Sequence, residues 1–275
     1  MGKIHDALQR AEQERARAGA HPGGAASAQL LLDPHPLLGH LSRRSERAER
    51  LRDSRRSRIM LADAESRVTE EYRTLRARIQ SIRRTRPVRS IVVTGALPGE
   101  GKTTTAVNLA LSFGLEREGR TCLVDADLRT PAVHNAMLET PETGLAELLE
   151  RDEKLERALI RVPDTRLSVL TVQALPQQPS ELLASRRMGE LIDELQSQFD
   201  TVIVDAPPVL GLPDATTLVD LCESALFVVG CGGASRHDIE LALTQIDTSK
   251  VLGCVFNRST ETPKTYGTRY GGRKF

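Results

Sequence analysis

The sequence lacks the features that mark a membrane-spanning, exported or nucleic-acid-binding protein. It has no secretory signal and no apolar stretch of about 18 residues, so we expect that the chain does not cross a membrane by itself. Its 38 Lys and Arg residues are balanced by 37 Asp and Glu residues, and the net charge of +1 excludes a strongly basic nucleic-acid binder. We therefore expect no nucleic acid among its partners.

Cysteine is also scarce. The chain has 4 cysteines with no C-x-x-C spacing, so the sequence indicates no metal cluster. Most of them lie in apolar, strand-like runs, which predicts buried thiols of a cytosolic protein. They are Cys122, Cys222, Cys231 and Cys254. A chain of 275 residues with 39% hydrophobic content is long enough for one sizeable α/β core with extensions left over.

What the chain does have is a phosphate-binding loop at residues 96–103, with the sequence ALPGEGKT. The loop follows the apolar run 91–94 and opens onto a helix-like segment that extends to about Glu118. Its small residues let backbone N–H groups close around phosphate oxygens, and we expect Lys102 to reach the β- and γ-phosphates. The Thr103 hydroxyl is a candidate Mg²⁺ ligand. Ala96 replaces the usual first glycine, and the alternative is a chance match.

Two aspartate motifs follow the loop along the chain. Asp125 and Asp127 come directly after the apolar run 121–124, and residues two apart on a strand point to the same side. Asp205 ends another apolar run. Because ligands bind at the carboxyl ends of parallel strands, we expect all three carboxylates beside the phosphates. There they would hold Mg²⁺ and accept a proton, with the base left open between Asp125 and Asp127. Taken singly, each Asp is equally well explained as a helix cap or turn residue.

Strands and helices alternate regularly from about Val88. This alternation predicts an α/β fold in which helices cover both faces of a mostly parallel sheet. The expected strands lie near residues 89–94, 121–125, 167–172, 201–205, 225–230 and 251–256.

Three motifs occur in the order found in the bacterial tyrosine kinases of capsule and exopolysaccharide synthesis. They are the loop ALPGEGKT, the sequence DADLR at 125–129 and the sequence DAPP at 205–208, and residues 68–258 as a whole resemble that family. The family belongs to the deviant P-loop ATPases, whose partitioning and septum-site members have a lysine where this chain has Leu97. The resemblance implies a Mg·ATP-dependent protein tyrosine kinase.

The resemblance also implies roles for individual residues. Lys102, Asp125 and Asp127 are the expected catalytic residues, and Thr103, Asp125 and Asp205 the expected Mg²⁺ ligands. The final strand leads to Asn257, which corresponds to an adenine-contacting residue of the family. The expected ATP-binding residues are Pro98, Gly99, Glu100, Gly101, Lys102, Thr103, Thr104, Asn257 and Arg258.

An E-x-x-R-x-x-R element lies upstream of the loop, at Glu70, Arg73 and Arg76. In relatives this element builds a ring of subunits, so the resemblance implies a homo-oligomer. Apolar residues at helical spacing predict a core-facing stripe that leaves the three charged side chains on other faces, free for a partner. The stripe consists of Val68, Tyr72, Leu75, Ile79 and Ile82. The alternative is a solvated face with a local Glu70–Arg73 pair.

Tyr266 and Tyr270 lie near the end of the chain, in the segment 259–275. This segment has no apolar periodicity, so we expect a flexible tail. Relatives autophosphorylate such a tail in trans, and the two tyrosines are the implied phosphate acceptors. The alternative is an inert basic tail.

The sequence divides into an N-terminal extension at 1–65, a kinase domain at 66–258 and the tail at 259–275. The extension begins with a short predicted helix at residues 2–19, a candidate for docking. The Arg-rich stretch 42–58 is typical of a solvated segment, and the alternative is attraction to an anionic membrane surface.

The resemblance to those family members that have no membrane span of their own implies two further partners. They are a separate transmembrane regulator of polysaccharide chain length and a tyrosine phosphatase. The regulator would recruit a cytoplasmic chain to the inner face of the membrane. A competing hypothesis is a positioning or partitioning ATPase switch without protein kinase activity. A small-molecule phosphotransferase would need an acceptor pocket that no motif indicates.

Overall fold

The computed structural model describes residues 65–136, 141–151 and 153–259. The predicted helix at 2–19, the Arg-rich stretch at 42–58 and the acceptors Tyr266 and Tyr270 lie outside the described residues. Within them, no helix combines the length and the apolar character needed to span a membrane.

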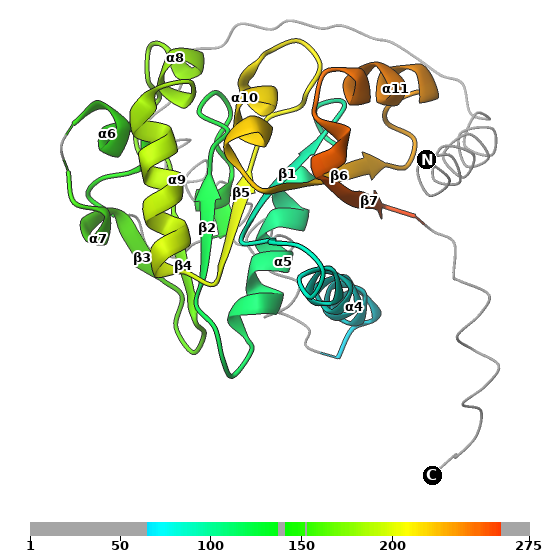
Figure 1. The fold of residues 1–275 in the computed structure, drawn as a ribbon, viewed down its shortest axis with the longest axis horizontal. Coiled ribbons are helices and arrows are strands. Elements are labelled where there is room, and N and C mark those ends of the chain that lie inside the picture. The colour runs from blue at the N-terminus through cyan, green and yellow to red at the C-terminus, as the bar shows by residue number, and fades with distance from the viewer. Residues whose placement is uncertain (1–64, 137–140, 152, 260–275) are drawn as a thin grey trace, which may run out of the picture.

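The described residues form a seven-stranded sheet in the order β3-β4-β2-β5-β1-β6-β7, shown in Figure 1. All neighbouring strands are parallel except the pair β3 and β4. Every residue of the central strands β1, β2 and β5 is buried, as expected for a sheet covered on both faces. The strands are β1 (Ser90–Gly95), β2 (Thr121–Asp125), β3 (Leu159–Arg161), β4 (Leu167–Leu170), β5 (Thr201–Asp205), β6 (Ser224–Gly230) and β7 (Val251–Asn257).

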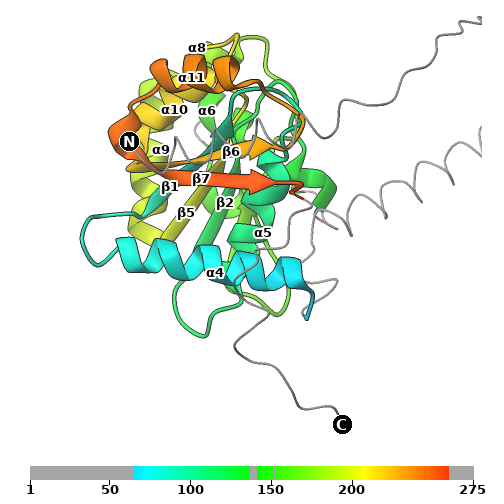
Figure 2. The same ribbon diagram turned by 90° about the vertical axis from the view of Figure 1, so that its right-hand side faces the viewer.

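Helices cover both faces of the sheet. The helices are α4 (Arg67–Ile82), α5 (Lys102–Gly114), α6 (Leu145–Glu150), α7 (Leu155–Ala158), α8 (Pro179–Leu183), α9 (Arg186–Gln198), α10 (Asp214–Leu221) and α11 (Arg236–Thr244), with 3₁₀ turns η1 (Val133–Ala136) and η2 (Thr248–Lys250). Helices α4 and α5 lie on one face, and α9, α10 and α11 lie on the other (Figures 1 and 2). Two separate apolar clusters, one on each side of the sheet, form the core.

The predicted fold class is confirmed, and the element boundaries differ in three places. The short antiparallel edge strand β3 was not predicted, and β4 ends at Leu170 rather than residue 172. Helix α5 ends at Gly114 rather than near Glu118. An added Cβ at Gly114 would lie 2.8 Å from Leu167 Cβ, so the helix ends where its backbone packs against β4. Of the cysteines, Cys122 and Cys222 are buried, whereas the other two are only half-buried.

Helix α4 corrects the predicted core stripe. Ser66 caps the helix by accepting a hydrogen bond from the Thr69 backbone N–H at 3.2 Å. Thr69, Tyr72 and Ile79 are buried, whereas Val68 is 40% exposed and was wrongly assigned to the core. In the first turn, the buried position is therefore occupied by a small threonine rather than by the neighbouring valine.

The prediction that Arg76 is free for a partner is also wrong. Its guanidinium pairs with Glu116 at 2.6 Å and donates to the Ser112 carbonyl of α5 at 2.5 Å. Arg73, by contrast, pairs with Glu70 on the exposed surface of α4. The three charged residues of the E-x-x-R-x-x-R element therefore divide into an exposed pair and one inward anchor between α4 and α5.

This division predicts unequal effects of two similar substitutions. Arg76→Ala should lower the free energy of unfolding by about 1–2 kcal/mol, because it removes hydrogen bonds from a charged, mostly buried group. Arg73→Ala should change it by less than about 0.5 kcal/mol, since exposed ion pairs contribute little. Urea unfolding of the monomeric chain measures both, and equal losses would contradict the anchoring role of Arg76.

Candidate functional site

The predicted site residues meet where β1, β2 and β5 end. Val93 of β1 and Asp125 of β2 both stand in register with Asp205 of the strand between them. The loop that follows β1 leads directly into α5, which begins at Lys102. The positive N-terminal end of a helix thus lies at the same edge of the sheet as the carboxylates.

The phosphate loop adopts the backbone conformation that its glycines permit. Gly99 and Gly101 have φ angles of 78° and 90°, in the left-handed region that favours glycine. Lys102 is 7% exposed, and its Nζ donates to the Leu97 carbonyl within the loop at 2.9 Å. Burial lowers the pKa of Lys102, and the nearby carboxylates of Glu100 and two aspartates act in the opposite direction. The ammonium group is therefore held inside the loop by the Leu97 carbonyl.

Glu100 ties the loop to the rest of the sheet. Its carboxylate is 1% exposed and accepts from the Leu97 N–H at 2.8 Å and from the Gly230 N–H at the end of β6 at 3.3 Å. An added Cβ at Gly95 would lie 2.5 Å from the Val228 backbone oxygen and 2.7 Å from this carboxylate, which leaves room only for glycine at that position. Burial raises the pKa of Glu100. The sequence placed Glu100 in the loop but gave no sign of its contact with β6.

Asn257, at the end of β7, lies against the loop. Its side-chain amide donates to the Glu100 carbonyl at 2.9 Å, and an added Cβ at Gly101 would lie 1.9 Å from the same nitrogen. The backbone N–H of Arg258 donates to the Asn257 side chain at 3.0 Å. Both residues are thus beside the nucleotide loop, and their contact with a nucleotide stays a prediction.

Asp125 and Asp205 form a buried pair of like charges. Asp125 Oδ2 accepts from the backbone N–H groups of Ala132 and Val133 at 3.1 and 3.0 Å. Asp125 Oδ1 and both oxygens of Asp205 have no hydrogen-bond partner in the described part of the chain. Burial raises the pKa of Asp125 to about 7, and burial followed by the Asp125 charge raises the pKa of Asp205 well above its usual range.

These orphaned oxygens fit a hard metal ion. Buried carboxylates without partners are costly unless a proton or a cation satisfies them. Thr103 and Lys102 lie close enough to Asp205 to lower its pKa, so a hydroxyl and an ammonium group border the same space. Within the described residues, no three His, Cys, Asp or Glu side chains form a metal cage. Two carboxylates and one hydroxyl, with water and phosphate oxygens completing the shell, are what Mg²⁺ accepts.

Asp127 lies just beyond the end of β2. Its carboxylate accepts from the Thr130 N–H and hydroxyl, both at 2.9 Å, and from the Arg129 N–H at 3.3 Å. Its charge raises the pKa of Asp125 and of Asp205, so it shares their crevice. Unlike those two residues, it is only half-buried and reachable from solvent.

Three residues at this edge were given no role from sequence. The guanidinium of Arg129 donates through Nε to Asp214 at 2.8 Å and through Nη2 to the Ser180 hydroxyl at 2.9 Å. Ser180 donates in turn to Asp214, which is 2% exposed. Arg129 belongs to the second motif and Ser180 to a family-like stretch, but no local pattern identifies Asp214.

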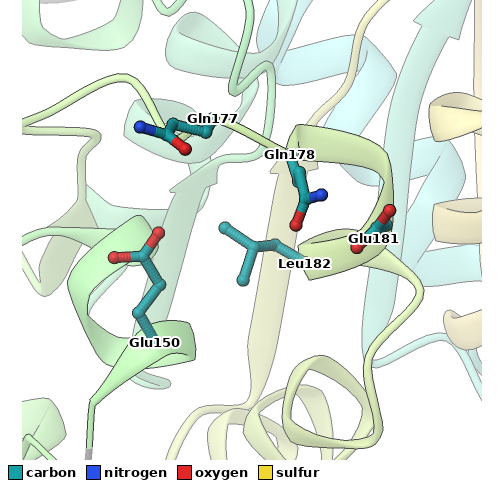
Figure 3. A pocket seen from close by; sticks show the side chains of 5 residues that line it. All are labelled: Glu150, Gln177, Gln178, Glu181 and Leu182. Atoms are coloured by element: carbon teal, nitrogen blue, oxygen red, sulfur yellow. The ribbon is translucent and has the colours of Figure 1, made fainter.

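A polar pocket of about 410 Å³ opens between α6 and α8. Figure 3 shows the Glu150 side chain reaching from α6 toward Leu182, with Gln177 and Gln178 on the segment that enters α8. Glu181 completes the lining. Helix α8 also carries Ser180, so this pocket and the aspartate crevice share a structural element.

The remaining predicted residues lie elsewhere. Thr104 is in the first turn of α5 and Pro98 is exposed on the loop. Glu70, Arg73 and Arg76 are on α4, which packs on α5 (Figure 2), whereas the site aspartates lie on or just after β2 and β5.

Comparisons with known proteins agree with this geometry. A family model described as an AAA domain matches residues 88–251. The chain is 36% identical over 201 residues to the tyrosine-protein kinase YwqD of Bacillus subtilis (strain 168), covering 72% of this chain and 84% of that protein.

Solved structures give the same picture. The chimerical protein CapA2B2 is similar with a TM-score of 0.70 and 31% identity, covering 74% of this chain and 91% of that one. The kinase domain of the Escherichia coli tyrosine kinase ETK is similar with a TM-score of 0.66 and 27% identity, covering 76% and 84%.

The loop geometry predicts different effects of alanine at its two glycines. Both have positive φ, so the backbone strain of alanine is similar. Only the methyl group at position 101 meets Asn257, whereas nothing lies within 4 Å at position 99. Gly101→Ala should therefore weaken ATP binding at least about 10-fold more than Gly99→Ala. Titration calorimetry measures both affinities, and equal losses would show that the contact with Asn257 is unimportant.

The buried carboxylates predict an unusual pH dependence. Because the pKa of Asp125 is about 7 in the folded chain and near 3.8 when unfolded, the native state binds the extra proton between these values. The stability of the metal-free protein should therefore fall as pH rises from about 4 to 7 through this group.

Asp125→Asn removes this titration. It should stabilise the metal-free protein at pH 8 by up to about 4 kcal/mol relative to wild type, with the difference vanishing near pH 4. Denaturant unfolding in a chelator at both pH values measures it. A variant that is less stable than wild type at pH 8 would refute the buried-charge interpretation.

Proposed function

Because the chain belongs to the family of bacterial tyrosine-protein kinases, we propose that it is a Mg·ATP-dependent tyrosine autokinase that phosphorylates its own C-terminal tail between subunits. The observation that carries the proposal is the convergence of Lys102 with three carboxylates at one edge of the sheet. That arrangement supplies both the positive charge and the acid–base groups that phosphoryl transfer needs.

The loop would bind the nucleotide phosphates. Its backbone N–H groups and the start of α5 would donate to phosphate oxygens, and Lys102 would leave the Leu97 carbonyl for the β- and γ-phosphates. Asn257 and Arg258, which lie against the loop, would contact the nucleoside. The exchange of one acceptor for another keeps the ammonium group hydrogen-bonded throughout.

Thr103, Asp125 and Asp205 would hold Mg²⁺. When bound, Mg²⁺ neutralises charge on the phosphates and orients them for in-line transfer. The orphaned oxygens of the two aspartates support this role, because an uncharged or hydrophobic ligand would leave them unsatisfied.

Asp127 is the proposed general base. One oxygen of Asp125 is occupied by two amides and the other is assigned to the metal, which leaves Asp125 no free oxygen for a proton. Asp127 is more exposed and lies in the same crevice. It would accept the phenol proton as the tyrosine oxygen bonds to the γ-phosphorus and the bond to the ADP oxygen breaks.

Tyr266 and Tyr270 are the proposed acceptors. Fewer than about 14 residues separate either tyrosine from the end of β7, so an extended tail would carry them at most about 45 Å from that strand. The tail carries four basic residues but only one acidic residue, Glu261, so it would be attracted to an acidic crevice. The basic residues are Lys264, Arg269, Arg273 and Lys274.

The wider setting follows from the family. We propose a homo-oligomeric ring in which the exposed Glu70 and Arg73 contact a neighbouring subunit. Arg76 would keep its contacts with Ser112 and Glu116 of its own subunit. A transmembrane chain-length regulator would recruit the kinase to the inner face of the membrane, and a tyrosine phosphatase would reverse the reaction. The output would be control of exopolysaccharide or capsule synthesis and export.

Mass spectrometry after incubation with Mg·ATP tests the function. Wild type should carry phosphate on Tyr266 or Tyr270, Lys102→Met should lose it by about 100-fold or more, and the exposed control Lys154→Met should keep it. Tyr72 is 8% exposed and should stay unmodified. A fusion to the activator's cytoplasmic segment belongs in the same experiment, because an isolated chain can lack activity.

A mixing experiment tests transfer between subunits. A Lys102→Met chain with an intact tail should be phosphorylated by an active chain carrying Tyr266→Phe and Tyr270→Phe. If neither mixture nor fusion yields phosphotyrosine while ATP is still hydrolysed, the positioning ATPase is the better assignment.

A further inference from the structure

We propose that Asp214 is a positioning residue for phosphoryl transfer, which acts by holding Arg129 so that the turn around Asp127 keeps its orientation. The inference rests on the proposed function and adds a residue that neither the motifs nor the assigned site contains.

The orientation of Asp127 depends on the residues that follow it. Its carboxylate accepts from the backbone N–H groups of Arg129 and Thr130 and from the Thr130 hydroxyl. Because these donors belong to the turn itself, they hold the carboxylate in place only if the backbone of the turn is also held in place. Further along, the amides that bind Asp125 belong to Ala132 and to Val133, whose side chain is fully buried in the core. Leu128, next to Asp127, is also in the core, but the two residues that donate to the Asp127 carboxylate, Arg129 and Thr130, are exposed.

The Arg129 side chain supplies a second anchor for the turn, beyond the buried Leu128. Two of its nitrogens are held by residues 51 and 85 positions away in sequence, Ser180 at the start of α8 and Asp214 at the start of α10. Helix α10 in turn packs against α8 and β1. The turn is thus tied to helices whose positions the sheet determines.

Asp214 is the central member of this network. It is 2% exposed, and its two oxygens accept separately, one from Arg129 and one from Ser180. A buried carboxylate is stable only with such partners, so Asp214 and Arg129 constrain each other. The guanidinium is 36% exposed on the side of the crevice, and its fork geometry, which lysine lacks, allows it to contact both residues at once.

The consequence is a selective effect on catalysis. A loosened turn would misplace the proton acceptor but leave the phosphate loop, which is held by Glu100 and Asn257, unchanged. Displacement of a catalytic group by about 1 Å can cost about 100-fold in rate. We therefore expect Asp214→Asn to lower kcat by about 10-fold or more while the affinity for Mg·ATP stays within about twofold.

The test is a mutant cycle on tail phosphorylation, with the Lys102→Met chain as acceptor. Asp214→Asn, Arg129→Lys and Ser180→Ala should each lower kcat without changing nucleotide affinity, Ser180→Ala least. The matched control Glu190→Gln removes the exposed Arg186–Glu190 pair on α9, 2.6 Å long, and should leave kcat unchanged. In an Asp127→Asn background, Asp214→Asn should have no further effect on kcat, because it acts through Asp127.

Several outcomes would overturn the inference. If the wild type transfers phosphate and Asp214→Asn transfers it at the same rate, the network is structural only. The same conclusion follows if thermal unfolding shifts but kcat does not, or if the losses from Asp127→Asn and Asp214→Asn multiply. Should Asp214→Asn fail to fold, the Ser180→Ala and Arg129→Lys variants decide by the same kcat comparison. Absence of any transfer by the wild type would instead refute the proposed function, and this inference with it.

Discussion

The structure depends on placing two carboxylates side by side, out of water, at the ends of adjacent parallel strands. Asp125 and Asp205 are in register, almost fully buried, and together have three oxygens without partners in the described residues. Such a pair is unfavourable unless it holds a proton or faces a cation. The neighbouring hydroxyl of Thr103 and ammonium group of Lys102 lower the pKa of Asp205 and so partly offset this cost. A site of this kind is destabilising when empty and becomes complementary to a phosphate-bound metal.

The surrounding elements keep this arrangement rigid. The phosphate loop is joined to β6 through Glu100 and to β7 through Asn257, so the two strands that follow β1 in the sheet order fix its shape. The segment after β5 is joined to β1 in turn, because the Thr94 hydroxyl donates to the Pro207 carbonyl at 2.8 Å. The turn at Asp127 is held by the buried Leu128 and by Arg129, which connects it to α8 and α10. Preorganisation of charged groups on rigid elements is the usual source of catalytic electrostatics.

Much of this could be predicted from sequence, because the strongest signals are local. The six expected strands are mostly apolar runs. Asp125 and Asp205 end two of them, and Asp127 lies two residues after Asp125. The exceptions depend on contacts distant in sequence. β3 has three residues, too few to show a period. Arg76 is directed inward by Ser112 of α5 and by Glu116 just after that helix, which the sequence of α4 does not reveal. Asp214 resembles any acidic residue at a helix start until Arg129 and Ser180 are placed beside it.

The most direct measurement of the central claim is a crystal structure with a non-hydrolysable ATP analogue and Mn²⁺ in place of Mg²⁺, using anomalous scattering to locate the metal. The account predicts one manganese position bounded by oxygens of Thr103, Asp125 and Asp205, with Lys102 Nζ moved from the Leu97 carbonyl to the phosphates. A nucleotide bound in the loop with the metal elsewhere, and with both aspartates still lacking partners, would contradict it.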